Sequence, residues 1–482
     1  MIPVFDNPSD LERKAKENFS IPPFLMMENA ASALAKLILE LNADGTKSLH
    51  IFCGKGNNGA DGLALARQVQ NKMPVFVYCP IPPSTEEGSV QYTMACKLGI
   101  PIKKSFDDFF QCNPCDSIIA DCIYGTGFHG SLPEDIKILF DNLNSLKDVI
   151  RIACDIPSGM SFKADYTVSM GELKLPFFTD KGKNVCGKII KTELGISSEK
   201  FEGLSQPVAE VITKDDIILP YRKNQSANKG TYGHTLVFAG EKSGAAVLCA
   251  SAAMNFGSGL TSLFKSKNSN LEQFKISPEL MICQSIPEKT TAISIGSGLG
   301  NIDEDILLPF TEWFHKKKNP ACVIDADLLT NKKLKNLLEE LNKNKESRII
   351  LTPHLKELQI LLENLEFDSE FTKCPLTEID RIKAGKEFTK RFANCTIIMK
   401  SAVTYIASEG NIYICQDGSP SLAKGGSGDV LAGMCAALLA QGYSSKDAAI
   451  TAVETHALAS HIASKESYSL TPEKLIKNIS ML

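Results

Sequence analysis

Short apolar runs rich in β-branched residues alternate with helix-like stretches along most of the chain. In the first half these runs are SLHIFC, PVFVYC, DSIIAD and VIRIACD, and helical patterns such as GADGLALARQVQ and LPEDIKILFDNLNSL lie between them. This alternation is typical of βαβ units, which build a parallel sheet with helices on both faces. The sequence therefore predicts an α/β fold.

A second series of the same kind follows, with the runs HTLVFAG, TSLFK, AISIGSG, ACVIDAD, RIILTPH, TIIMKSAVTYIAS and NIYICQ. Residues 196–230, between the two series, are rich in polar and turn residues, which favours a domain boundary near residue 210. A chain of 482 residues is also too long to fold around one ordinary hydrophobic core. Because the halves share no repeat, we expect a fusion of two different domains, residues 1–210 and 211–482.

Composition excludes several classes of function. A net charge of −4 and a pI near 6.1 give no basic excess, so we expect no nucleic-acid partner. No apolar run approaches about 18 residues and the N-terminus has no apolar core, so we expect neither a membrane span nor export. The 15 cysteines are scattered, which predicts reduced thiols and a cytoplasmic protein. The lone CxxC, Cys112 to Cys115, has no second pair, so we predict no zinc or redox role for it.

The loop Gly54–Gly59, GKGNNG, lies between a predicted strand and a predicted helix and matches the pattern GxGxxG. A dehydrogenase would place an acid at the end of the next strand, but that strand ends in Cys79 and Pro80, which argues against simple NAD-dependent hydride transfer. Backbone N–H groups and two asparagine amides suit phosphate or a cation. A tight turn with helix-capping asparagines is the alternative interpretation.

Two carboxylates, Asp121 and Asp155, also end predicted strands. The carboxyl ends of parallel strands meet at one crevice, where ligands bind in open α/β sheets. A pair of carboxylates there could hold ribose, bind a cation or perform acid–base chemistry. Taken singly, either aspartate could instead cap a helix or a loop.

In the second half, GGSGD at Gly425–Asp429 runs directly into the helical pattern VLAGMCAALLA. Backbone N–H groups at a helix start bind anions, and Asp429 would lie beside a bound phosphate. The loop is not a Walker motif, because GxxxxGK[ST] is absent. A flexible linker capped by Asp429 is the alternative.

The motifs of the first 200 residues together resemble the NAD(P)H-hydrate epimerase domain: MMENAA at 26–31, GKGNNGADG, DCIYGTGFHG, DIPSG and ADYT at 164–167. The resemblance implies a Rossmann-like three-layer α/β/α domain with Asp155 as the acid–base residue. It implies a potassium ion held by Asn58, Asp121 and Ser158, whose oxygen atoms suit a hard cation. The substrate pocket would be lined by Asp155 and by Asn57, Asn58, Gly59, Ala60, Asp61, Gly125, Thr126, Gly127, Phe128, His129, Gly130 and Ser131.

This half departs from the pattern of the family at two places. Ala60 stands where a glycine is usual, and Lys174, Leu175 and Pro176 stand where Lys-Pro-Gly is usual. An alanine is tolerated at position 60 if its φ is negative but would be strained in the left-handed region.

Residues 229–460 resemble the ADP/ATP-dependent NAD(P)H-hydrate dehydratase domain, which implies a ribokinase-like α/β fold. The motifs are KG with YGH at 229–234, GAA at 244–246, GSGLG at 296–300, DAD at 325–327, LTPH at 351–354, KSAVT at 400–404 and GGSGD. The resemblance implies that hydrated NADH or NADPH contacts Ala245, Gly298, His354 and Asp429. It also implies an adenine nucleotide, ADP or ATP with Mg²⁺, bound by Lys400, Ser401, Ala402, Val403, Thr404 and Gly428.

A mechanism follows from the chemistry of the substrate. Hydration leaves a hydroxyl on the nicotinamide ring, and Asp429 would deprotonate it for attack on a phosphoryl group, which the loop amides stabilise. Phosphate then leaves and the double bond returns. Ser401, Ser297 and Ala239–Glu241 differ from the usual residues of the family, but none of these changes removes a charged catalytic group.

Two other functions remain open at this point. A ribokinase-like kinase for a vitamin or pyrimidine, fused to a Rossmann-like partner, also accounts for GGSGD, and the N-terminal domain could be a non-catalytic binding module. We further predict a homo-oligomer. His456 and His461 are five residues apart and not four, so we interpret them as surface or core residues and not as a metal pair.

Overall fold

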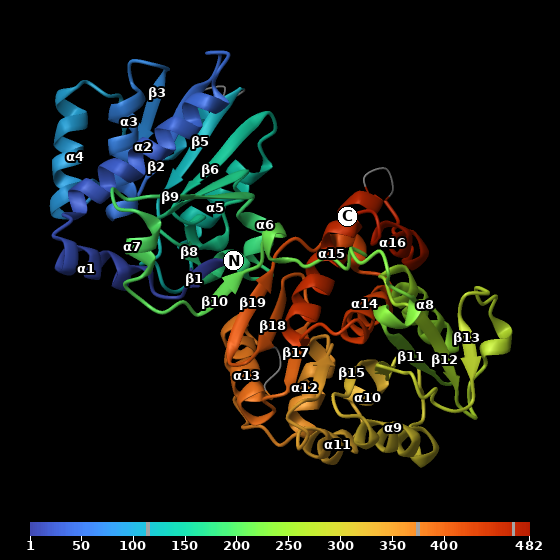
Figure 1. Cartoon of the computed structure of the whole chain (residues 1–482). Helices are drawn as coiled ribbons and strands as arrows, with labels where there is room; N and C mark the ends of the chain where they lie inside the picture. Colours follow the sequence, from blue (N-terminus) through green and yellow to red (C-terminus); the bar gives the residue numbers. More distant parts are fainter. Residues whose placement is uncertain (112–115, 373–375, 465–467) are drawn as a thin grey trace. The chain divides into compact units, whose positions relative to one another are not determined.

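The alternation in the sequence folds into largely parallel sheets. The computed structural model describes residues 1–111, 116–372, 376–464 and 468–482. It divides into an N-terminal unit, residues 3–208, and a C-terminal unit, residues 209–482 together with Met1 and Ile2 (Figure 1). The predicted α/β class is confirmed in both units. Cys112 and Cys115 lie outside the described residues.

The N-terminal unit contains a seven-stranded sheet in the order β4-β3-β2-β5-β6-β7-β9, with every pair of neighbours parallel. A further parallel pair joins β1 to β8. Its elements are β1 Ile2–Phe5, α1 Pro8–Phe19, α2 Pro23–Leu41, β2 Ser48–Cys53, α3 Asn57–Val69, β3 Val75–Tyr78, α4 Glu86–Lys97, β4 Ile102–Lys103, β5 Ser117–Cys122, α5 Glu134–Ser145, β6 Val149–Cys154, β7 Tyr166–Met170, β8 Leu173–Lys174, α6 Gly182–Val185, β9 Lys188–Thr192 and α7 Ser198–Glu202.

Two apolar clusters cover the faces of this sheet. One joins α2 and α3 to the strands through residues such as Leu34 and Leu63. The other joins α5 to the strands through Phe140, Phe52 and Phe109. Strand β2 is buried at every position after Ser48, as expected for a parallel strand covered on both faces. The unit therefore has the predicted three layers, and the loops at the carboxyl ends of its strands remain free to form a site.

The C-terminal unit contains ten strands in the order β13-β12-β11-β14-β15-β16-β17-β18-β19-β10. Strands β13 to β17 are parallel, whereas β18 is antiparallel to both β17 and β19. Its elements are β10 Ala209–Val211, β11 His234–Ala239, α8 Ser243–Asn255, β12 Leu260–Lys265, β13 Met281–Cys283, β14 Ala292–Ile295, α9 Glu304–Lys316, β15 Ala321–Ile324, α10 Ala326–Leu329, α11 Leu334–Leu341, β16 Arg348–Leu351, α12 Leu355–Asn364, α13 Glu378–Arg391, β17 Cys395–Met399, β18 Thr404–Ser408, β19 Asn411–Cys415, α14 Ser427–Ala440, α15 Ser445–Ser464 and α16 Pro472–Asn478.

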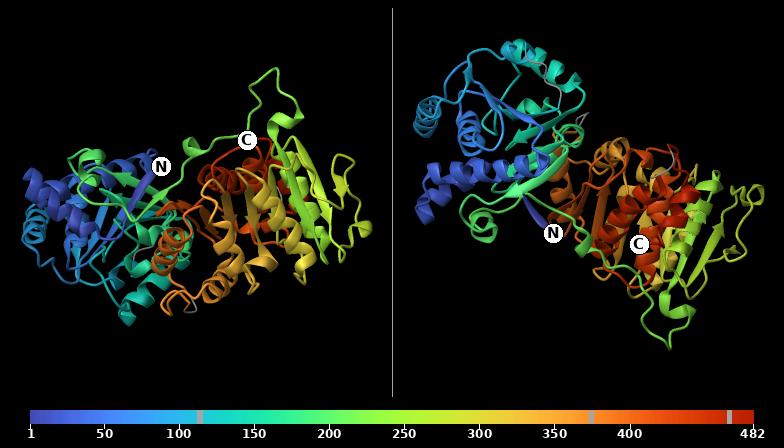
Figure 2. Two further views of the ribbon diagram at one scale, coloured as in Figure 1. Left: turned by 60° about the horizontal axis from the view of Figure 1, so that its bottom comes forward. Right: turned by 90° about the horizontal axis from the view of Figure 1, so that it is seen from above.

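Helices cover both faces of this sheet as well. In the left view of Figure 2 the red helices of the C-terminal end lie above the strands, and the yellow and orange helices lie below them. The helix α14 is almost wholly buried, and it packs against α8 through small residues; a Cβ at Gly433 would lie 2.1 Å from the Cys249 carbonyl oxygen. This close approach fixes the start of α14, where GGSGD lies.

The structure bears on three further expectations from the sequence. The run TIIMKSAVTYIAS is not one strand, because it turns at residues 400–403 into the hairpin of β17 and β18. The described cysteines are free thiols and most are buried, as predicted. Within the described ranges, no helix combines the length and the apolar character needed to cross a membrane.

Candidate functional sites in the two units

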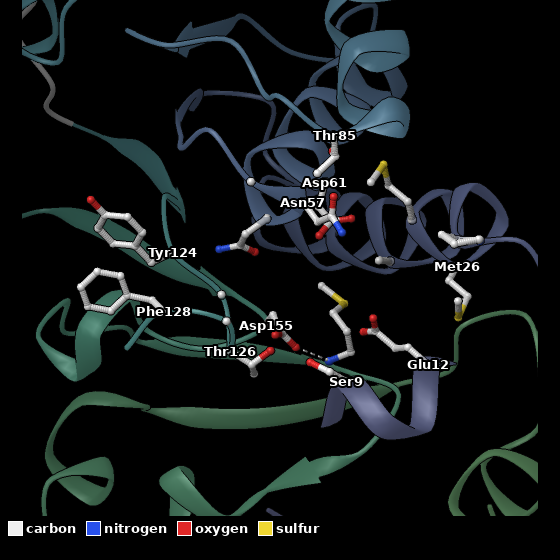
Figure 3. Close-up of a pocket in the computed structure, with 18 of the residues that line it drawn as sticks. Ser9, Glu12, Met26, Asn57, Asp61, Thr85, Tyr124, Thr126, Phe128 and Asp155 are labelled. Atoms are coloured by element: carbon white, nitrogen blue, oxygen red, sulfur yellow. Dashed lines mark hydrogen bonds between the residues drawn. The ribbon is translucent and has the colours of Figure 1, made fainter. Parts of the chain in front are cut away.

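A cavity of about 470 Å³ opens at the carboxyl ends of β2, β5 and β6 in the N-terminal unit (Figure 3). A second cavity, of about 410 Å³, adjoins it and shares Lys55, Ile123 and Tyr124 with it. The crevice expected from three polar strand ends is therefore present. The first cavity is lined by Ser9, Glu12, Pro23, Met26, Met27, Ala30, Lys55, Gly56, Asn57, Asn58, Asp61, Thr85, Ile123, Tyr124, Gly125, Thr126, Gly127, Phe128, Asp155, Met170 and Leu194.

The GKGNNG loop needs its glycines for close backbone contacts. A Cβ at Gly54 would lie 2.0 Å from the Ile123 carbonyl oxygen, and one at Gly59 would lie 1.9 Å from the Gly54 carbonyl oxygen. Asn57 and Asn58 begin α3 and reach the cavity. Ala60 is buried in α3 and is not among the residues with positive φ, so its methyl group is accommodated without backbone strain.

The predicted potassium ligands lie in a buried polar region. The Asp121 carboxylate accepts hydrogen bonds from the Ser158 hydroxyl at 2.7 Å and from the Ser158 backbone N–H at 2.8 Å. Burial raises the pKa of Asp121 to about 6, although these hydrogen bonds act to lower it. The Asn58 amide is buried, and neither its oxygen nor its nitrogen has a hydrogen-bond partner among the described residues. An unpartnered amide oxygen suits a hard monovalent cation.

Asp155 forms the centre of a buried charge cluster. Its Oδ1 accepts from the Met170 backbone N–H at 3.2 Å and from the Lys174 Nζ at 2.8 Å. The Lys174 Nζ also lies 2.9 Å from the Glu172 Oε1, and both of these side chains are almost completely buried. Asp155 has a φ of +67°, a strained conformation that aims its side chain from the end of β6. Lys174, the residue of the altered segment that agrees with the family, therefore supplies the cation of this site.

Two more carboxyl groups face the same cavity, Glu12 from α1 and Asp61 from α3 (Figure 3). Burial, and then the nearby charges of Asp155 and Glu172, raise the pKa of Glu12 to about 7. Burial also raises the pKa of Asp61 well above its usual value. Asp61 belongs to the predicted set. Glu12 does not, because it precedes the recognised motifs in the chain and only the fold brings it to the cavity.

The predicted loop Gly125–Ser131 reaches the cavity only in part. Gly125, Thr126, Gly127 and Phe128 line it, and the Tyr124 and Phe128 rings stack with centroids 4.3 Å apart. The structure does not place the other predicted residues of this site at the wall of the cavity: Gly59, Ala60, His129, Gly130 and Ser131.

In the C-terminal unit, buried Asp325 at the end of β15 connects several strand ends. It accepts hydrogen bonds from the Ser297 hydroxyl at 3.1 Å and from the Thr352 hydroxyl at 2.5 Å. The Lys400 Nζ lies 3.3 Å from the Asp325 Oδ1. The DAD motif of the sequence therefore supplies a carboxylate that holds Lys400 beside the glycine loop.

Asp429 lies in the first turn of α14, close to this cluster. Burial, and then the charge of Asp325, raise the pKa of Asp429 to about 6, whereas Ser297 and Lys400 act to lower it. A Cβ at Gly428 would lie 3.4 Å from the Lys400 Nζ, so the loop and the lysine are neighbours. The site therefore combines a half-buried base, a cation and the free N–H groups of a helix start.

The other predicted residues of the C-terminal site fall into two neighbouring pairs. A Cβ at Gly298, whose φ is +65°, would lie 3.0 Å from the Ala245 Cβ, so these two residues are in contact. His354 and Lys400 are paired across adjacent strand ends. His354 is exposed and caps α12, and residues 401–404 form the hairpin turn that follows Lys400 and enters β18.

The two histidines near the C-terminus have different surroundings. His456 is buried and its Nε2 lies 3.1 Å from the Ser427 carbonyl oxygen, whereas the His461 Nε2 lies 2.6 Å from the Asp417 carbonyl oxygen. In the described part of the chain, no group of three or more His, Cys, Asp or Glu side chains could hold a metal ion. Asn58, the candidate ligand for a monovalent cation, is an amide and does not belong to these four residue types.

Both units have the features of a nucleotide-handling α/β enzyme: glycine loops at helix starts, and carboxylates and lysines at the carboxyl ends of parallel strands. Comparison with known proteins identifies the class of enzyme. The family described as NAD(P)H-hydrate dehydratase matches residues 235–481, and the family described as YjeF-related protein N-terminus matches residues 24–175. The chain belongs to the family of bifunctional NAD(P)H-hydrate repair enzymes.

Relatives match over nearly the whole chain. The bifunctional NAD(P)H-hydrate repair enzyme of Helicobacter pylori is 34% identical and covers 100% of both chains. That of Coxiella burnetii is 30% identical over 95% of this chain and 93% of its own. Among solved structures, ADP/ATP-dependent NAD(P)H-hydrate dehydratase from Bacillus subtilis, co-crystallised with ATP and Mg²⁺, is 25% identical with a TM-score of 0.46, covering 57% of this chain and 97% of its own.

Proposed function

We propose that residues 1–210 interconvert the R and S forms of hydrated NADH and NADPH, and that residues 211–482 dehydrate the S form at the expense of ADP or ATP. The observation that carries this proposal is the presence of two separate sites in a chain of the repair-enzyme family. Each site has a carboxylate, Asp155 or Asp429, in a cluster with a lysine at the carboxyl ends of parallel strands.

In the N-terminal site, Asp155 contacts the hydrated ring and exchanges a proton with it through Oδ2. Its Oδ1 is held by Lys174 and Met170, whereas Oδ2 accepts no hydrogen bond among the described residues. Asn57, the glycine loop and residues 125–128 hold the remainder of the substrate. Asn58, Asp121 and Ser158 would hold potassium, which would supply positive charge for the phosphates or the ring oxygen.

In the C-terminal site, Asp429 removes the proton of the ring hydroxyl, and the hydroxyl oxygen attacks a nucleotide phosphoryl group. The N–H groups at the start of α14 stabilise the transferring charge, because they lie at the positive end of the helix. Ala245 and Gly298 contact the substrate, and Lys400 to Thr404 with Gly428 hold the nucleotide. Mg²⁺, which would neutralise charge on the phosphates, would be held near Asp325.

The test uses purified full-length protein and separated epimers of hydrated NADH. With ADP or ATP, the S form should be converted to NADH, measured by its absorbance, and the R form should follow through epimerisation. Asp429→Asn should abolish recovery of NADH, while Asp155→Asn should abolish only the enzymatic use of the R form. Failure to recover NADH from the S form with either nucleotide would leave a small-molecule kinase as the better assignment.

Assembly and location are tested separately. We expect the chain to form a homo-oligomer and to work in the cytoplasm on free hydrated dinucleotide. Sedimentation analysis of the purified chain measures the first, and fractionation of cells measures the second.

A further inference from the structure

Carboxyl groups from two different elements line the N-terminal cavity. Glu12 reaches it from α1 and Asp155 reaches it from the end of β6, and Figure 3 shows both side chains directed into the same space. They are close enough for the charge of Asp155 to raise the pKa of Glu12. An epimerisation by loss and return of water needs a proton donor and a proton acceptor at one carbon, and two carboxyl groups in one cavity supply such a pair.

The two carboxyl groups differ in their partners. Asp155 forms an ion pair with the buried Lys174 at 2.8 Å. Glu12 has no ion pair among the described residues, because the nearby cations Arg13 and Lys14 pair with Asp10 on the outer side of α1. The Glu12 side chain is exposed and lines the cavity. A carboxyl group with a lysine partner beside one without a cation is the arrangement expected of a base and an acid.

We propose that Glu12 is a second catalytic residue of the N-terminal site and forms with Asp155 the acid–base pair that epimerises the hydrated ring. This inference rests on the proposed epimerase function and assigns its missing acid. Protonated Glu12 gives its proton to the hydroxyl of the hydrated carbon, and the carbon–oxygen bond breaks so that water leaves with the bond electrons. The lone pair of the ring nitrogen forms a carbon–nitrogen double bond in its place.

Water then adds to the opposite face of the same carbon. The electron pair of that double bond returns to the ring nitrogen, and the surplus proton of the water passes to Oδ2 of Asp155. One proton has moved from Glu12 to Asp155, one water has left and one has entered, so the ring regains its composition with inverted configuration. The reverse conversion uses the same two residues with their roles exchanged.

The active enzyme therefore carries one proton on the Glu12–Asp155 pair, whichever epimer is the substrate. The charged or titratable groups that face Glu12 are Asp61, Asp155, Glu172 and Lys174. Burial and the acidic neighbours raise the pKa of Glu12 to about 7, and Lys174 acts to lower it. We expect epimerisation to slow as the pH rises through about 7, because Glu12 then loses the proton that the reaction needs.

The test compares Glu12→Gln with the parent chain, using the R form without nucleotide and measuring the S form by chromatography. We expect kcat to fall at least about 100-fold with little change in KM, and Glu12→Asp to retain part of the activity. The loss of activity above pH 7 should be absent from the residual rate of Glu12→Gln. In water labelled with ¹⁸O, the parent chain should incorporate one solvent oxygen for each inversion.

Controls separate this role from a structural one. Glu17→Gln changes an exposed glutamate of the same helix, paired only with Arg13, and should leave the rate unchanged. Dehydration of the S form with nucleotide should be normal in Glu12→Gln, which shows that the C-terminal unit is intact, and an unchanged KM for the R form shows that the N-terminal unit is folded. Three results would overturn the inference. They are a normal epimerisation rate in Glu12→Gln, a loss of activity above pH 7 that disappears in Asp61→Asn and not in Glu12→Gln, and inversion without incorporation of solvent oxygen. A parent chain that fails to interconvert the epimers would instead refute the proposed function.

Discussion

Asp155 uses its two carboxylate oxygens for different purposes. Oδ1 is fixed by Lys174 and by the Met170 backbone N–H, and Oδ2, which accepts no hydrogen bond among the described residues, is the atom that we propose for contact with the substrate. Lys174 and its second partner, Glu172, are almost completely buried, so neither side chain can be solvated by water if the other is removed. The position of this base therefore depends on a lysine that does not itself line the cavity.

We expect Lys174→Met to lower the free energy of unfolding of the N-terminal unit by about 3 kcal/mol, because it leaves Asp155 and Glu172 buried without a cation. Denaturant unfolding and epimer conversion measure the effect. Lys191→Met, which breaks the more exposed pair with Glu202, should cost less than about 1 kcal/mol. Equal losses in the two variants would contradict a special role for the buried pair.

Asp429 gives a second prediction at this scale. Its pKa of about 6 means that dehydration should slow as the pH falls through about 6, because the base becomes protonated. Ser297 acts to lower this pKa, so Ser297→Ala should move the midpoint of the acid limb upward. The pH dependence of kcat/KM for the S form measures the midpoint, and a downward shift would contradict the assigned base.

The residues of the sites differ in how far the sequence could predict them. Asp155, Asn58 and Asp429 follow strands or begin helices inside short motifs, so local pattern and resemblance identify them. Glu12 lies in an amphipathic helix outside those motifs, and only the fold brings it to the cavity that Asp155 also lines. Its signal in the sequence, one acid in a charged helix, does not differ from that of a solvated surface residue.

At the scale of the elements, the loops after the strands control both sites. The loop after β14 contains Gly298, whose φ of +65° and contacts with Lys242 and Ala245 leave no room for a side chain. The hairpin between β17 and β18 holds Lys400 next to His354. These loops are short and packed against one another, so a change of backbone in one should displace the substrate contacts of its neighbours.

We expect Gly298→Ala to reduce kcat/KM of dehydration roughly 100-fold, since a new Cβ would lie 2.4 Å from the Lys242 carbonyl oxygen and would move the loop. Gly410→Ala is the matched control. Its φ of +79° carries a similar backbone strain, about 1–2 kcal/mol, but no atom lies within 4 Å of the new Cβ. Similar activity in both variants would show that the steric contact is unimportant.

The elements themselves were largely predictable, with understandable exceptions. Strands with continuous apolar runs, such as β2 and β15, were evident because both faces are buried. The two-residue strand β4 was not, since its order comes from pairing with β3 and not from its own pattern. The sequence does not reveal the hairpin of β17 and β18, because residues 400–403 contain no glycine or proline to mark the turn.

At the scale of the whole chain, each unit has its own sheet, its own apolar cores and its own candidate site. The family of the chain joins the two activities in one polypeptide, and the R form needs both of them. Because the intermediate S form is a free dinucleotide, the proposed chemistry does not require the two sites to be in the same molecule.

A mixture of Asp155→Asn and Asp429→Asn chains should therefore recover NADH from the R form at about half the rate of the parent at equal total protein. Each chain supplies one intact site, and the S form diffuses between them. The measurement is NADH absorbance with nucleotide present, after subtraction of spontaneous epimerisation. A mixture no faster than the Asp155→Asn chain alone would show that the S form must pass within one molecule.

The buried ion pair of Lys174 also protects the protein chemically. Burial alone would lower the pKa of Lys174, but the charges of Asp155 and Glu172 outweigh it and raise that pKa above its usual value. The hydrated carbon of the substrate is bonded to both nitrogen and oxygen and is therefore an electrophile, which a neutral amine would attack. As an ammonium ion, Lys174 has no lone pair to offer, so it can lie beside the substrate-binding carboxylate without being alkylated by the compound that the enzyme repairs.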